Sequence, residues 1–138
     1  METIFENKFV TALFDQEKRL LIDIWQESTL EMTNDQCWEI LKAWEHFPRT
    51  YKPEAILIDS RQMNFVLTPD MHQWIADNIT RPSVATGLKK MATLLPSAIF
   101  EQVAMHQALS EVAEERGLQN RIFDDEAKAK EWLLSVEG

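Results

Sequence analysis

The chain has 138 residues, of which 45% are hydrophobic, and it carries a formal net charge of −9. This length suits one domain with a substantial core, so we expect a single domain over residues 1–138. The negative charge disfavours nucleic acid and anionic membranes as partners, because both attract clustered lysine and arginine. No apolar run approaches the roughly 20 residues that cross a bilayer, and the acidic start is unlike a signal peptide. The single cysteine, Cys37, excludes an internal disulfide, and we expect a cytoplasmic protein with no transmembrane segment.

Two strands joined by a polar turn are expected first, over residues 9–14 and 19–25. In the second strand, alternate apolar residues fall on one face and Asp23 interrupts the other. This pattern is typical of a half-covered strand near the edge of a sheet. Thr33 then begins a helix with a capping box, and we expect this helix to end near Pro48.

The run from Ala55 to Ile58 is unbroken apolar sequence that stops at charge. It predicts a strand buried on both faces, at the centre of a parallel sheet. The next helix begins at Thr68, which offers a hydroxyl cap and is followed by a proline and an acid. This helix carries Trp74 and is expected to stop before Pro82.

The remaining elements are a strand over residues 88–95, a long helix over 97–117, a short strand over 121–123 and a final helix after Asp124-Asp125. The whole order is β-β-α-β-α-β-α-β-α. It predicts an α/β domain whose mixed, mostly parallel sheet has about five strands and is covered by four helices.

This order resembles the STAS superfamily, in particular its SpoIIAA-like branch, which shares a lipid-binding-like topology with the Sec14 domains. The resemblance lies in the segments ILIDSRQMN, TPDMHQW and RIFDDEAKAKEWL. The wider family includes bacterial anti-sigma-factor antagonists, which bind a kinase partner and are switched by phosphorylation. The resemblance therefore permits both a regulatory domain that binds a protein partner and a domain that binds a lipid-like small molecule.

In those antagonists an Asp-Ser-Ser-Gly-type motif follows the central strand, and residues 64–70 lack it. The phosphorylation switch is therefore not carried over intact. Thr68, at a comparable helix start, and the nearby Ser60 are the candidates for phosphorylation. An ordinary N-cap is the simpler interpretation of Thr68.

The carboxyl ends of the predicted strands bring several polar residues to one edge of the sheet. One interpretation is a shallow pocket near Trp25 in which Arg61 anchors an anion beside the helix start at Ser97. The more ordinary interpretation is that Asp59 and Arg61 pair, and that the acids at Asp124-Asp125 cap a helix.

We find no pattern that indicates catalysis or a metal. The three histidines, His46, His72 and His106, fall on three different predicted helices without paired spacing. Ser60 and Ser97 lack the glycine-framed elbow of a serine nucleophile. We therefore expect a protein that is not an enzyme and that has no catalytic residues, metal or cofactor.

The long helix carries apolar residues on two nearly opposite sides, of which one holds Ile99, Phe100 and Val103. A straight helix on one sheet face cannot bury both sides, so the first half has to bend or pack elsewhere. The loop over residues 63–67, which includes Phe65, adds apolar side chains nearby. The ordinary alternative is that loop and helix cover each other.

Two functions follow. The first is a non-catalytic regulatory or protein-interaction domain, expected to be a homodimer through this loop and helix. The second is a binder or sensor of an apolar, lipid-like small molecule, held in a cleft between the Trp74 helix and the Ile99–Val103 helix. The residues of the ligand or partner face are Trp25, Asp59, Arg61, Phe65, Trp74, Ile99, Phe100 and Val103.

Overall fold

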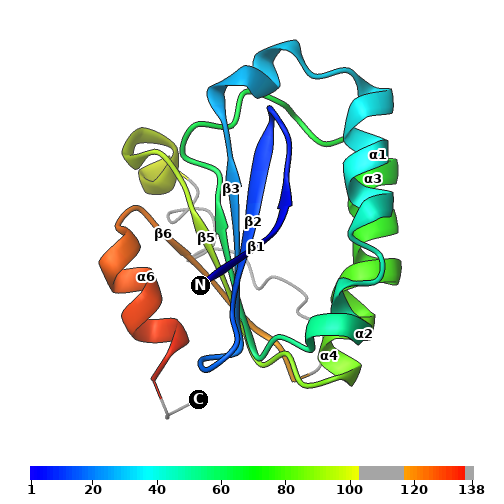
Figure 1. Ribbon diagram of the computed structural model, residues 1–138. Helices are drawn as coiled ribbons and strands as arrows, with labels where there is room; N and C mark the ends of the chain where they lie inside the picture. The colour runs from blue at the N-terminus through cyan, green and yellow to red at the C-terminus, as the bar shows by residue number, and fades with distance from the viewer. Residues whose placement is uncertain (103–116, 136–138) are drawn as a thin grey trace.

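The computed structural model describes residues 1–102 and 117–135, which form an α/β domain around one six-stranded sheet (Figure 1). The second strand pairs antiparallel with the first and with the third, and the pairs from the third strand to the sixth are parallel. The sheet is thus mixed, as predicted. In spatial order its strands are β1 (Glu2–Glu6), β2 (Val10–Asp15), β3 (Leu20–Trp25), β4 (Ala55–Asp59), β5 (Lys90–Leu94) and β6 (Gln119–Phe123).

Strand β1 is the element that the sequence did not predict. It lies at the edge of the sheet beside β2, and its residues are exposed or half-buried. Because β1 and β2 lie outside β3 on one side and β4 follows on the other, β3 is an interior strand. The expectation that Asp23 marks a half-covered strand near an edge is therefore wrong, since Asp23 is only 8% exposed.

The helices lie on both faces of the sheet (Figure 1). One face is covered by the helices between β3 and β5, and the opposite face by the C-terminal helix, α6. The helical elements are the 3₁₀ turn η1 (Glu27–Glu31), α1 (Asn34–Ala43), α2 (Phe47–Tyr51), α3 (Pro69–Ile75), the π-helical turn η2 (Ala76–Thr80), α4 (Arg81–Ala85) and α6 (Glu126–Leu133). Residues 97–102 are also helical, and the rest of the expected long helix lies outside the described residues.

The predicted helix starts are confirmed by their capping hydrogen bonds. The Thr33 hydroxyl accepts from the backbone N–H of Gln36 at 3.1 Å, and the Gln36 side chain accepts from the Thr33 N–H at 2.9 Å. The Thr68 hydroxyl accepts from the backbone N–H of Met71 at 3.2 Å. These side chains satisfy N–H groups that have no partner inside the helix.

The helix ends differ from the prediction. The first helix ends at Ala43, and Pro48 belongs to the separate short helix α2. The helix from Thr68 does not stop before Pro82 but continues through η2 into α4. Pro82 has no N–H to donate, and the wider π turn before it accommodates this loss, while the Ser83 hydroxyl donates to the Ile79 carbonyl at 2.6 Å.

Side chains alternate between two hydrophobic clusters, one on each face of the sheet. Leu57 on β4 is 1% exposed under α6. Its neighbour Ile58, which points to the opposite face, is only half-buried. Burial of β4 on both faces thus holds for its first three residues and not for Ile58. None of the helices in the described part of the chain combines the length and hydropathy needed to span a bilayer.

Candidate functional site

A cavity of about 600 Å³ lies between the sheet and the helices that cover the face opposite α6. Its floor is formed by β3, β4 and β5, its sides by α1, α2, α3, η2 and α4, and its rim by the loop after β4. Most of the residues that line it are apolar: Leu21, Trp25, Leu41, Trp44, Phe47, Ile56, Ile58, Met63, Phe65, Val66, Leu67, Ile75, Ala76, Ile79, Leu88 and Met91. Volume and lining are those of a small-molecule pocket.

Among the described residues, side chains on this face of the sheet are less completely covered than those on the opposite face. On β5, Met91 and Thr93 face the cavity and are half-buried, whereas Ala92 and Leu94 face α6 and are 0% exposed. Protein interiors are normally packed with few voids larger than a water molecule. A space of this size beside a well-packed opposite face therefore needs an explanation.

Asp23 is the buried acid of this cavity. It projects from β3 on the same side as Leu21 and Trp25, among the lining residues. Its Oδ1 atom is buried and has no hydrogen-bond partner in the described structure. Burial raises the pKa of Asp23 from 3.8 to about 7, because a charged carboxylate is poorly solvated there.

Trp44 supplies a second buried polar atom without a partner. The residue is 5% exposed and lines the cavity, and its indole Nε1–H has no acceptor among the described residues. Its ring is held by Phe47, at a centroid distance of 5.7 Å, and by Trp25, at 5.5 Å. Two residues of the cavity lining thus each have one buried polar atom, an acceptor on Asp23 and a donor on Trp44, without a hydrogen-bond partner in the described structure.

The loop after β4 is tied down at two points. The Ser60 hydroxyl donates to the Leu94 carbonyl at 2.7 Å, and the backbone N–H of Asn64 donates to the Thr29 hydroxyl at 2.7 Å. Beyond these anchors, Phe65 is half-buried and Val66 is 89% exposed, although both line the cavity. The loop therefore forms a rim with an exposed apolar tip.

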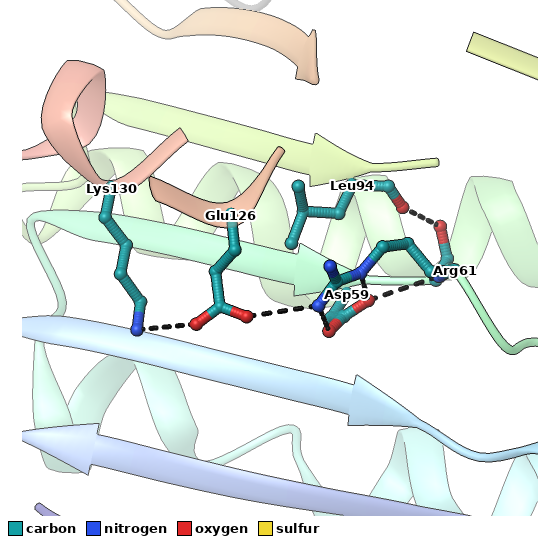
Figure 2. Close-up of polar contacts among 6 residues, drawn as sticks. Asp59, Arg61, Leu94, Glu126 and Lys130 are labelled. Carbon is teal, nitrogen blue, oxygen red and sulfur yellow. Dashed lines mark hydrogen bonds and ion pairs between the residues drawn. The ribbon is translucent and has the colours of Figure 1, made fainter. Parts of the chain in front are cut away.

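The carboxyl end of β4 carries a chain of ion pairs rather than an open anion site (Figure 2). The Arg61 guanidinium contacts Asp59 at 2.7 Å and Glu126 at 3.1 Å. Lys130 contacts the other oxygen of Glu126 at 2.8 Å. Arg61 is therefore already engaged by two carboxylates, as in the more ordinary of the two interpretations. The Asp125 carboxylate accordingly caps α6, accepting from the backbone N–H of Lys128 at 3.0 Å.

These contacts also shift the pKa values of the acids. Burial alone would raise the pKa of Asp59, but the hydrogen bonds and charge of Arg61 outweigh it and lower the value. The pKa of Glu126 is lowered mainly by its hydrogen bond from Lys130, with Arg61 contributing. Both acids stay ionised, so this end of the sheet is a structural network.

The structure brings together only some of the residues predicted for the ligand or partner face. Trp25 and Phe65 line the cavity. Trp74 does not line it and instead packs edge-on against Trp38, with ring centroids 6.1 Å apart. Ile99 is 48% exposed, and neither it nor Phe100 lines the cavity. Val103 lies outside the described residues. The cavity is thus on the inner side of α3, toward the sheet.

Asp23 and Trp44 are site residues that the sequence did not lead us to predict. Asp23 is the single acid in the otherwise apolar strand LLIDIW, and that signal was present. An acid that interrupts one face of an alternating strand is typical of a half-covered edge strand, and only the interior position of β3 shows that Asp23 is buried. Trp44 gave no signal, since an aromatic residue on the apolar side of a helix is ordinarily core.

The structure also places the remaining candidate groups of the described residues, two histidines and the cysteine. His46 shares a hydrogen bond with Thr50 at 3.0 Å, His72 lies at the cavity, and His106 is outside the described residues. Burial raises the pKa of the Cys37 thiol to about 11. Within residues 1–102 and 117–135, no three His, Cys, Asp or Glu side chains are grouped so as to hold a metal ion.

Comparisons of this chain with protein-family models, with curated proteins and with solved structures found no match.

Proposed function

We propose that this protein is a non-catalytic binding domain that holds an apolar small molecule in the cavity between the sheet and α1–α4. The observation that carries the proposal is an apolar space of about 600 Å³ beside a closely packed core. Burial of an apolar ligand there would remove the lining side chains from water, which is favourable in proportion to the area covered. The exposed loop tip at Val66 marks the side from which a ligand would enter.

The second candidate is the interaction domain that acts through a homodimer. The resemblance to SpoIIAA-like domains permits a protein partner, and Ile99 and Val66 are exposed apolar residues of the helix and loop expected at that interface. The other large apolar side chains exposed in the described residues, Met1, Leu30 and Leu134, lie on different elements. The cavity has no role in this function, so it favours the small-molecule proposal.

The proposal is tested by titration with N-phenyl-naphthylamine, an uncharged fluorophore that brightens in apolar surroundings. We expect saturable binding with one site per chain, together with a change in tryptophan emission, because Trp25 and Trp44 line the cavity. Ala76→Phe places an aromatic ring in the cavity wall and should abolish binding.

The matched control is Ala127→Phe, which adds the same ring at an exposed position of α6 on the other side of the sheet. It should bind like the wild type. Equal binding by both variants would show that the fluorophore sits elsewhere and would contradict the proposal. Sedimentation of the wild type and of Phe100→Asp tests the homodimer proposal. Phe100→Asp should convert a dimer into a folded monomer only if that face is the interface.

A further inference from the structure

We infer that the cavity selects an apolar molecule that carries a hydroxyl group, such as a long-chain or polycyclic alcohol, and that Asp23 and Trp44 bind this hydroxyl. The inference rests on the proposed function, because it names the class of ligand that the same cavity takes. It is carried by two buried polar atoms of cavity-lining residues that have no partner in the described structure.

Asp23 stands out among the buried polar side chains of the described structure, which are Asp23, Thr29, Ser83 and Lys90. Thr29 donates to the Gln26 carbonyl at 2.7 Å, and Ser83 donates to the Ile79 carbonyl at 2.6 Å. The Lys90 ammonium donates to the Ser135 hydroxyl at 2.7 Å. Among these four, only Asp23 has a buried side-chain atom with no hydrogen-bond partner in the described structure. Buried polar groups are almost always hydrogen-bonded in folded proteins, and in this inference the bound molecule supplies the partner that the described residues do not.

The chemistry of the two atoms defines what that molecule offers. Asp23 Oδ1 needs a hydrogen-bond donor, and the Trp44 Nε1–H needs an acceptor. A hydroxyl group supplies both. An alkane supplies neither and would leave both protein atoms unpaired, which disfavours it against the alcohol.

Charged head groups fit less well. An ammonium has no lone pair for Trp44, and it would form an ion pair inside an apolar cavity, where the loss of hydration offsets much of the attraction. A carboxylate has no proton for Asp23 and would bring a second negative charge beside it.

The lining also lacks a compensating cation. Its titratable residues are Asp23 on β3 and His72 on α3, and no described lysine or arginine lines the cavity. His72 is exposed, whereas Asp23 lies on the floor. The raised pKa of Asp23 agrees with these surroundings. An uncharged ligand with a polar end therefore suits the floor of the cavity.

The test compares two probes of similar length, 1-decanol and decyl methyl ether, as competitors that displace N-phenyl-naphthylamine. The ether keeps the acceptor oxygen and lacks the donor. The competition is run above the raised pKa of Asp23, at about pH 8, where its carboxylate can only accept hydrogen bonds. For the wild type we then expect the alcohol to bind about tenfold more tightly than the ether, since the ether leaves Asp23 unpaired.

Three variants separate the two contacts. Asp23→Leu should bind the fluorophore but reduce the preference for alcohol to within about twofold, because no acceptor remains. Asp23→Asn keeps an acceptor oxygen and should retain most of the preference. Trp44→Phe should weaken alcohol and ether by the same factor, because both lose the donor, and should leave their ratio unchanged. If Asp23→Leu does not fold, Asp23→Ala, which also lacks an acceptor, takes its place with the same loss of preference expected.

The contrary results separate this inference from the proposed function. Wild-type protein that binds the fluorophore but shows equal affinity for alcohol and ether overturns this inference and leaves the proposed function intact. The inference is likewise overturned if Asp23→Leu keeps the preference, or if decylamine or decanoate binds more tightly than decanol. Failure of the wild type to bind the fluorophore at all overturns the proposed function itself.

Discussion

The two faces of the sheet are built from neighbouring residues of the same strands, yet they differ in how closely the helices pack on them. The face under α6 is filled, and its buried charge, Lys90, donates to the Trp132 and Ser135 carbonyls at 3.0 and 3.1 Å. The opposite face contains the cavity, and its buried acid, Asp23, has an oxygen without a partner in the described structure. The same chain thus satisfies a buried charge on one face and not on the other.

This difference indicates that the two faces have different roles. The α6 face is closely packed, whereas the opposite face has a cavity whose lining residues include two with buried polar atoms that lack a hydrogen-bond partner in the described structure. Composition does not explain the contrast, because both faces are rich in branched apolar residues. What differs is how the helices cover the sheet. Helix α6 packs directly on β4 and β5 (Figure 1), whereas the helices on the other face line a cavity.

The largest effect is expected from a pair of adjacent substitutions on β4. Leu57→Ala should lower the free energy of unfolding by about 2–5 kcal/mol, because it leaves a void in a packed region. Ile58→Ala, on the cavity side, should lower it by only about 1 kcal/mol, since Ile58 is half-buried and already borders empty space. Urea unfolding of both variants measures the two values. Equal losses would contradict the claimed difference between the faces.

The next effect is the pH dependence that Asp23 contributes. Its pKa is raised to about 7 in the folded protein, so the folded state holds a proton that the unfolded state has lost above about pH 4. Stability from this group therefore falls as the pH rises from about 4 to 7. Asp23→Asn should remove this loss, and we expect it to stabilise the protein by on the order of 2–4 kcal/mol at about pH 8 and by little at about pH 4.

Asp59→Asn is the control, because it should change the pH dependence of stability in the opposite direction. The pKa of Asp59 is lowered, so its ionised form stabilises the folded protein above the pKa of the unfolded state, and this contribution is lost as the pH falls. The substitution should destabilise the protein near neutral pH and matter less in acid. Thermal unfolding over a pH series measures the stability of both variants. A wild-type-like pH profile for Asp23→Asn would show that Asp23 is not held in a poorly solvated site.

The smallest effect is expected at the ion pairs beyond β4. Arg61→Met should lower the free energy of unfolding by about 1 kcal/mol. Arg61 and Glu126 are well exposed to solvent, so most of this loss comes from Asp59, whose side chain is only 13% exposed and would lose its partner. Since Asp59 and Glu126 already occupy Arg61, the wild type should also show no calorimetric binding of inorganic phosphate. Binding of phosphate that Arg61→Met removes would restore the anion-anchor interpretation and would place function at the strand ends.

Much of the fold could be predicted from local patterns. Apolar runs and alternation indicated five of the six strands, and the capping residues Thr33, Thr68 and Asp125 marked helix starts, because these signals lie within a few neighbouring residues. Strand β1 was missed since its alternation is weak and it gains stability only by pairing with β2. The continuation through Pro82 depends on a π turn, which has no clear sequence signature.

The site could be predicted only in part, because a cavity is a property of packing between distant elements. Trp25 and Phe65 were identified as face residues, and they do line the cavity. To predict Asp23 as a site residue, one must know that β3 is an interior strand. To predict Trp44, one must know that its indole N–H has no acceptor among the described residues. Absence of a partner cannot be inferred from one sequence.

The central claim, that the face opposite α6 holds an apolar ligand, is tested most directly by native mass spectrometry of freshly purified protein. We expect a folded chain with one bound molecule that organic solvent extracts, retained by Ala127→Phe and absent from Ala76→Phe. Protein that is purified bare, and that takes up no 1-decanol in either the wild type or Ala127→Phe, would contradict the claim.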